Sequence, residues 1–204
     1  ATITRQEFAQ GQTAVPWAPK AYLRHDRTAA ASSATTVLEQ RVNSVDPHLG
    51  ATVTVSVWLR AGAAKIFAID FLQHFGRGGS PDVSIASQPI SVSTSWSKFA
   101  LTFTLPSTSG KTTGEDDYLS VRIREESQIS VFRLDIALFK LERGSTATEF
   151  VREKNQQIID ECLYYYQRID ASGNILFNFA IGSIQTANSF EALLFYTWKR
   201  RFPT

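Results

Sequence analysis

The side chains best suited to recognition chemistry are an aspartate, a histidine and two arginines on stretches that alternate like strands. Asp70 and His74 share one side of their stretch, and Arg122 and Arg124 share the polar side of another. Successive residues of a strand point to opposite faces, so each pair is expected to lie on one face. If the two stretches adjoin, their carboxylate, imidazole and guanidinium groups form one polar surface.

Trp58 is the aromatic ring that the alternation places on a polar side. It shares a face with Thr54 and Ser56, whereas the valines between them point the other way. An aromatic ring covers the apolar face of a pyranose while neighbouring polar groups bind its hydroxyls, so this arrangement suits sugar recognition. Alternatively, a loop or a neighbouring subunit covers the ring. The candidate ligand-binding residues are Trp58, Asp70, His74, Arg122 and Arg124, and a polar and aromatic groove forms if their strands adjoin.

Two further tryptophans are interpreted as packing residues. Trp17 lies between Pro16 and Pro19 and is expected to plug a rigid loop, while Trp96 opens a strand and is expected to pack at the edge of the fold.

No catalytic or metal-binding constellation emerges. His25, His48 and His74 fall on different candidate elements, without paired-histidine zinc spacing, a nucleophile elbow or a convincing carboxylate pair. The glycine-rich loop 76–80 lacks the ending of a phosphate-binding loop and predicts a tight connection. The acidic run 115–117 could hold structural calcium, but a solvated turn is the favoured interpretation. The chain is therefore predicted to be non-enzymatic and without a cofactor.

Composition narrows the class of partner. Of the 204 residues, 43% are hydrophobic, which is enough apolar material to form a core. The net charge is +2, which is too small to indicate a nucleic-acid partner. The apolar runs are too short to cross a bilayer, so no membrane insertion is predicted. The single Cys162 excludes an internal disulfide and fits assembly in a reducing cytosol. Methionine is absent, and both ends are interpreted as cuts in a longer polypeptide.

The alternation predicts a mainly β fold. At least five strands are indicated, at 52–59, 67–71, 99–105, 119–123 and 132–138, with weaker candidates at 21–24 and 36–42. Segments rich in Gly, Ser, Pro and Asp separate them, which is typical of an antiparallel jelly-roll sandwich. About eight strands are expected before residue 141.

The pattern changes after residue 144. Apolar residues recur at three- and four-residue spacing over 151–168, which predicts one short amphipathic connector helix. Alternation resumes at 175–181 and 190–198, which predicts a C-terminal β-segment. The expected organisation is a jelly-roll domain over 1–143, a linker and helix over 144–170, and the start of a further β-region over 171–204.

Several motifs, taken in order, resemble virion proteins of tailed bacteriophages, in particular tail-fibre and receptor-binding proteins. The longest are the run 141–150, LERGSTATEF, and the run 161–168, ECLYYYQR. In the second, Leu163-Tyr164 replaces the Gln-Arg pair that is usual in the family. The remaining matches fall at residues 73–81, 94–99, 103–111, 116–119, 134–137 and 199–204.

The resemblance implies a carbohydrate-binding-module-like jelly roll in a fibre component that adheres to host cell-surface polysaccharide. It also implies a homotrimer with other virion tail proteins as partners, made in the host cytoplasm and located in the virion. The alternative is a structural virion module that spaces or trimerises the fibre without binding glycan. In that case Tyr164, Tyr165 and Tyr166 lie in subunit contacts.

Overall fold

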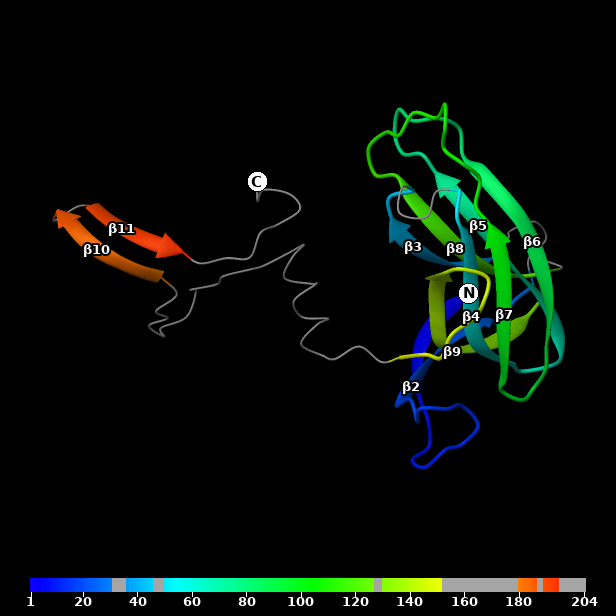
Figure 1. Cartoon of the computed structure of the whole chain (residues 1–204). Helices are drawn as coiled ribbons and strands as arrows, with labels where there is room; N and C mark the ends of the chain where they lie inside the picture. The colour runs from blue at the N-terminus through cyan, green and yellow to red at the C-terminus, as the bar shows by residue number, and fades with distance from the viewer. Residues whose placement is uncertain (31–35, 46–49, 127–129, 152–179, 187–188, 195–204) are drawn as a thin grey trace. The chain divides into compact units, whose positions relative to one another are not determined.

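The computed structural model describes residues 1–30, 36–45, 50–126, 130–151, 180–186 and 189–194. The chain divides into two compact units, Ala1–Phe150 and Val151–Thr204, and the described elements of both are strands (Figure 1). Apart from Val151, the predicted connector helix lies outside the described residues. In the part of the chain that is described, no helix is long and apolar enough to cross a membrane.

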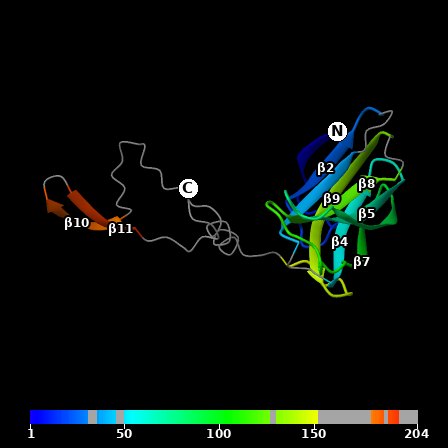
Figure 2. The same cartoon turned by 90° about the horizontal axis from the view of Figure 1, so that it is seen from above.

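Two antiparallel sheets form the first unit. Sheet A has the strand order β1 (Thr2–Glu7), β2 (Ala21–Arg27), β9 (Phe132–Arg143), β4 (Thr52–Ala61) and β7 (Ser97–Thr104). Sheet B has the order β3 (Val37–Asn43), β8 (Tyr118–Glu125), β5 (Lys65–His74) and β6 (Val83–Val92). The chain crosses repeatedly between the sheets, as a jelly roll does. Figure 2 shows β9 lying beside β4 in the middle of sheet A.

The core lies between the sheets because one side of each central strand is apolar. Along β4, Val53, Val55, Val57 and Leu59 are at most 1% exposed. Aromatic rings join the layers: Phe71 of β5 meets Phe103 of β7 edge-on at 4.9 Å, and Phe67 meets Phe132 at 5.5 Å. The polar residues that alternate with this core therefore lie on the two outer faces.

The strands predicted from alternation are all present as β2, β3, β4, β5, β7, β8 and β9, so the mainly antiparallel β prediction is confirmed. The sequence did not indicate β1 and β6, each of which lies at one of the two edges of its sheet. In the second unit, β10 (Ala180–Thr186) pairs antiparallel with β11 (Ser189–Leu194), within the predicted C-terminal β-segment.

The glycine-rich loop after β5 is a close backbone crossing. The N–H of Arg77 donates to the carbonyl of Glu115 at 2.8 Å, and the N–H of Gly114 donates to that of Phe75 at 2.7 Å. A Cβ atom on Gly114 would lie 2.1 Å from the Arg77 carbonyl oxygen. Gly76, Gly79 and Gly114 are therefore required by the contact between the two loops, in agreement with a tight connection.

Replacing Gly114 with alanine is expected to lower the free energy of unfolding by about 2 kcal/mol, because the backbones must separate to admit a methyl group. Urea denaturation measures the change. Gly78→Ala is the matched control, since a Cβ there meets nothing within 4 Å and tests only the cost of its φ of +78°. Equal losses in both variants would refute the crossing as the cause.

His25 makes the stability depend on pH. The residue is 3% exposed, and its ring meets Phe132 edge-on at 4.9 Å. Burial lowers the pKa of His25 because it penalises the imidazolium ion. The unfolded chain therefore binds this proton more readily. The stabilisation is complete above about pH 6.5 and declines below it by up to about 1.4 kcal/mol per pH unit, until the folded pKa is reached.

Urea midpoints measured from about pH 7.5 down to about pH 5 should fall in the parent chain and change less in His25→Leu. An identical pH slope in both proteins would show that another group causes it.

Candidate ligand-binding site

Sheet B brings together three of the predicted site residues. Asp70 of β5 lies directly opposite Arg122 of β8, and Arg124 is two residues along the same strand. Arg122 Nε donates to Asp70 Oδ1 at 2.5 Å, and Arg124 Nε donates to Oδ2 at 3.0 Å. The Asp70 side chain is buried, while both arginine side chains are about one-fifth exposed. Asp70 therefore fixes two arginines on the outer face, as the shared-face argument predicts.

These residues form part of a depression of about 410 Å³ in the outer face of sheet B. Its volume lies within the range of about 300 to 1,000 Å³ that is usual for small-ligand sites. Ser84 and Ser87 supply hydroxyl groups, and Val37 and Ile85 supply apolar walls. The β6 side of the depression includes a bulge, where the register with β5 shifts between Ile69 and Phe71. The site thus combines charged, hydroxyl and apolar groups on rigid strands.

His74 lies on the same sheet, in a separate cluster with its own partners. Its Nδ1 lies 2.8 Å from Asp82 Oδ1, and its ring lies 4.5 Å from that of Tyr118. The Arg41 guanidinium lies 4.2 Å from the Tyr118 ring centroid and also donates to Glu39. Sequence reasoning did not single out Tyr118 or Arg41, although the alternation of β8 places Tyr118 on the face of Arg122.

Trp58 does not join these residues. It lies on β4 in sheet A, where its register partners are Ala137 of β9 and Lys98 of β7. The groove was predicted on the condition that the strands adjoin, and this condition is not met for Trp58, because β4 lies in sheet A and β5 and β8 lie in sheet B. Alternation correctly placed Trp58 on the polar side of β4. It could not show that β4 and β5 belong to opposite sheets.

The outer face of sheet A has its own charged cluster around the buried Asp135. Arg24 donates to it through Nε at 2.7 Å and Nη2 at 3.0 Å, and Arg60 donates through Nε at 3.0 Å and Nη2 at 2.5 Å. The hydrogen bond to Asp135 also raises the pKa of Arg24. These contacts tie β2, β9 and β4 together, which indicates a brace across the sheet.

Aromatic rings close over the Arg60 side of this brace. The Arg60 guanidinium lies 4.9 Å from the Trp96 ring centroid and 5.6 Å from that of Tyr22. Phe8 packs on both rings, at 4.8 Å from Tyr22 and 5.4 Å from Trp96. Trp96 is thus a packing residue, as predicted. Trp17 is 64% exposed with a φ of 63°, so the prediction that it plugs a loop is wrong.

The chain that leaves β9 lies over the other end of the same face. Thr54 Oγ1 donates to the carbonyl of Gly144 at 2.7 Å, and Thr102 Oγ1 donates to that of Ser145 at 3.3 Å. Glu142 accepts hydrogen bonds from the N–H and hydroxyl of Thr148, and the hydroxyl bond is the main reason that the pKa of Glu142 is lowered. Thr54 points outward yet is 1% exposed, so sheet A is covered here by its own chain.

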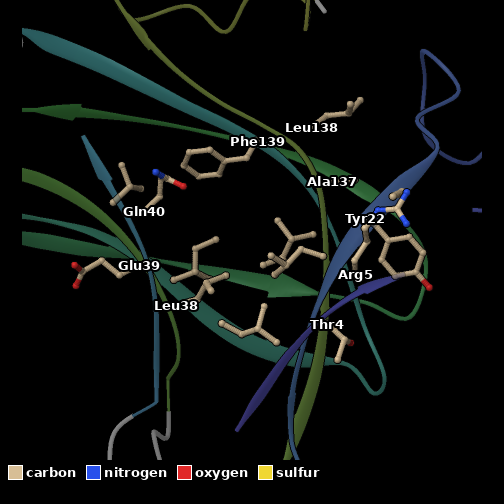
Figure 3. A pocket seen from close by; sticks show the side chains of 15 residues that line it. Thr4, Arg5, Tyr22, Leu38, Glu39, Gln40, Ala137, Leu138 and Phe139 are labelled. Carbon is tan, nitrogen blue, oxygen red and sulfur yellow. The ribbon is translucent and has the colours of Figure 1, made fainter. Parts of the chain in front are cut away.

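A second depression is an apolar groove of about 690 Å³ between the sheets. Figure 3 shows Leu38 on one side and Ala137 and Phe139 on the other. Its charged lining residues are Arg5 and Glu39. Side chains from β1, β2 and β9 face those from β3 and β8 across it, so the groove marks where the sandwich opens at its edge.

The acidic run predicted as a turn or calcium site takes part in loop contacts. Asp117 Oδ2 accepts a hydrogen bond from the backbone N–H of Val45 at 2.7 Å. Among the residues that the structure describes, no group of three or more His, Cys, Asp and Glu side chains is placed to hold a metal ion.

No family model matches the sequence, and no curated protein matches it. Solved structures similar to the chain include the N-terminal cellulose-binding domain of Cellulomonas fimi β-1,4-glucanase C, at 14% identity and a TM-score of 0.46, covering 62% of this chain and 80% of that one. A family 30 carbohydrate-binding module matches at 10% identity and a TM-score of 0.45, covering 71% of this chain and 78% of that one.

The enzymatically active domain of bacteriophage CBA120 tailspike protein 4 matches at 11% identity and a TM-score of 0.43, covering 70% of this chain and 19% of that one. These similarities do not identify the tail-fibre family, and at these TM-scores they do not bear on what this chain binds.

Proposed function

We propose that this chain is a non-enzymatic carbohydrate-binding module and that it binds host cell-surface glycan on the outer face of sheet B. The observation that carries the proposal is the depression of about 410 Å³ over Asp70, Arg122 and Arg124. Its guanidinium groups are held in place by hydrogen bonds, so little conformational freedom is lost when a ligand binds. Ser84 and Ser87 add hydroxyl groups that can bind those of a sugar.

Sheet B is favoured over sheet A because its two arginines line a depression, although the arginine side chains of both faces are exposed to a similar extent. On sheet A the charged cluster is packed against aromatic rings at one end, and residues 144–145 are hydrogen-bonded to the outer face at the other. On sheet B the walls of the depression are short side chains of β6 and Val37 of β3. The charged cluster of sheet B therefore borders a depression, whereas that of sheet A is packed against aromatic rings.

Binding without catalysis suits the chemistry of the depression. Asp70 is its one lining carboxylate, and both of its oxygens accept hydrogen bonds from arginines. Glycoside hydrolysis usually needs two carboxyl groups on either side of the scissile bond. A buried, doubly bonded aspartate is suited to holding guanidinium groups and poorly suited to moving protons.

The wider setting that we propose is a phage tail fibre that carries three copies of the chain in the virion. A shallow site of this size binds a glycan weakly by itself. Three sites held on one fibre bind a polysaccharide surface with greater avidity, because the second and third contacts form at high effective concentration. Tyr164, Tyr165 and Tyr166, which would lie at subunit contacts in a purely structural module, are outside the described residues.

Filling the depression tests the proposal. Ser84 is exposed on β6, and Ser84→Trp places an indole where the ligand is expected. We expect binding of the purified chain to host cells and envelope polysaccharide to fall at least about tenfold, the equivalent of about 1.4 kcal/mol. Ser91→Trp is the matched control, because Ser91 is an exposed residue of the same strand outside the depression.

Trp58→Ala separates the two faces and is expected to leave binding unchanged. Loss of binding in Trp58→Ala with normal binding in Ser84→Trp would move the site to sheet A. An absence of saturable binding by the parent chain would leave the structural virion module as the better explanation.

A further inference from the structure

Both outer faces carry two arginines on one buried aspartate, but they use the guanidinium nitrogens differently. On sheet A, Arg24 and Arg60 each donate to Asp135 through both Nε and Nη2. The carboxylate there occupies the hydrogen-bonding edge of each guanidinium. Nη2 of each arginine also donates to the Tyr22 hydroxyl, so both Nε and Nη2 are engaged within the protein.

On sheet B, each arginine is bound to Asp70 through Nε alone. Within the described part of the chain, the Nη atoms of Arg122 and Arg124 donate to no protein group. An arginine offers five N–H donors in a planar fork that matches the oxygens of a carboxylate or phosphate. The depression therefore has guanidinium N–H groups available to a ligand.

The charged groups around the depression also favour an anionic ligand, because arginines outnumber carboxylates there. Glu39 of β3 lies opposite Arg122, but its carboxylate already binds Arg41. The charged residues that line the depression are Asp70, Arg122 and Arg124, and their net charge is +1. The other side chains that line the depression, among them Ser84, Ser87 and Val37, are uncharged. A neutral sugar would leave this charge without a partner, whereas an anionic group would balance it.

We infer that the ligand of the depression is an acidic glycan, with an oxyanion substituent that binds the Nη groups of Arg122 and Arg124. The inference rests on the proposed function and specifies its ligand. The oxyanion is a uronic acid carboxylate or a sulfate or phosphate ester. Each accepts charge-assisted hydrogen bonds, which are stronger than neutral ones. Ser84 and Ser87 then bind sugar hydroxyls beside it.

Calorimetric titration of the whole chain with oligosaccharides of matched length tests the inference. The probes are an oligogalacturonate, a sulfated glucan oligosaccharide and the neutral cello-oligosaccharide. One or both acidic ligands should bind at least about tenfold more tightly than the neutral one, and their affinity should fall as salt rises from about 50 to about 500 mM. The preferred acidic ligand identifies the oxyanion.

Arg122→Gln/Arg124→Gln should abolish the preference for acidic ligands, with circular dichroism confirming the fold. Arg133→Gln is the charge control, because Arg133 is an exposed residue of sheet A paired with Asp26. An equal loss of acidic binding in this control would show a general charge effect and overturn the inference.

If the paired substitution unfolds the chain, Ser84→Trp replaces it and should remove the binding of acidic ligands. Tighter binding of the neutral ligand, sensitive to Ser84→Trp, would refute the acidic ligand but keep the proposed function. No binding of any of the three, nor of host polysaccharide, would refute both.

Discussion

Replacing Phe71 with alanine is expected to lower the free energy of unfolding by about 4 kcal/mol. Phe71 is fully buried in β5 of sheet B, and its ring lies 4.9 Å from Phe103 of sheet A. The substitution removes a contact between the layers and leaves a cavity that well-packed strands cannot close. Urea denaturation followed by tryptophan fluorescence measures the loss.

Phe71→Leu is the control for this prediction, since it keeps most of the buried volume and should cost clearly less. A loss below about 1 kcal/mol in Phe71→Ala is the size expected at a surface site. It would contradict the placement of Phe71 between two packed sheets.

Asp135→Ala is expected to cost about 3 kcal/mol of stability and to leave glycan binding unchanged in the folded protein. Asp135 is 2% exposed at its side chain and accepts hydrogen bonds from both Arg24 and Arg60, which lose their acceptor together. Breaking such a buried pair costs roughly 3 to 5 kcal/mol. We expect a loss at the lower end of this range because both arginine side chains are partly exposed, so water can hydrate their guanidinium groups once the carboxylate is removed.

Asp26→Ala provides the comparison on the same face. Its partner Arg133 is half exposed, so the expected loss is below about 1 kcal/mol. Equal losses in the two variants would contradict the role of Asp135 as a brace. A fall in glycan affinity with Asp135→Ala alone would move the binding site from sheet B to sheet A.

Alternation predicted the central strands because one of their sides is buried. The valines of β4 occur at every second residue, and all three are buried in the core: Val53, Val55 and Val57. The same rule placed Asp70 on one face of β5 and Arg122 on one face of β8. From the sequence, contact between Asp70 and Arg122 could be predicted only on the condition that their strands adjoin. In the structure the strands do adjoin, and the two residues lie directly opposite each other.

Two of the four edge strands of sheets A and B, β1 and β6, were not predicted because their residues are buried less regularly. β6 contains Pro89, which lacks a backbone N–H, and its register with β5 shifts between Ile69 and Phe71. Proline is tolerated at a sheet edge, but in sequence it interrupts a strand pattern. β1 is mostly exposed on both sides and thus has no buried period.

The order of the strands limited the prediction of the site. Trp58 and Asp70 lie in consecutive strands, yet the chain passes from one sheet to the other between β4 and β5. No local pattern records such a crossing, because both strands bury one side in the same core. The contact of the chain after β9 with Thr54 and Thr102 was likewise unpredicted, since it depends on long-range backbone acceptors.

The most direct test of sheet B as the glycan-binding face is an NMR titration of the nitrogen-15-labelled chain with the tightest-binding oligosaccharide. Saturable shifts are expected at the Nε–H signals of Arg122 and Arg124 and at the backbone amides of residues 84–87. The indole N–H of Trp58 should stay in place. Saturable shifts at Trp58 with unchanged signals at Arg122 and Arg124 would contradict the assignment and place the ligand on sheet A.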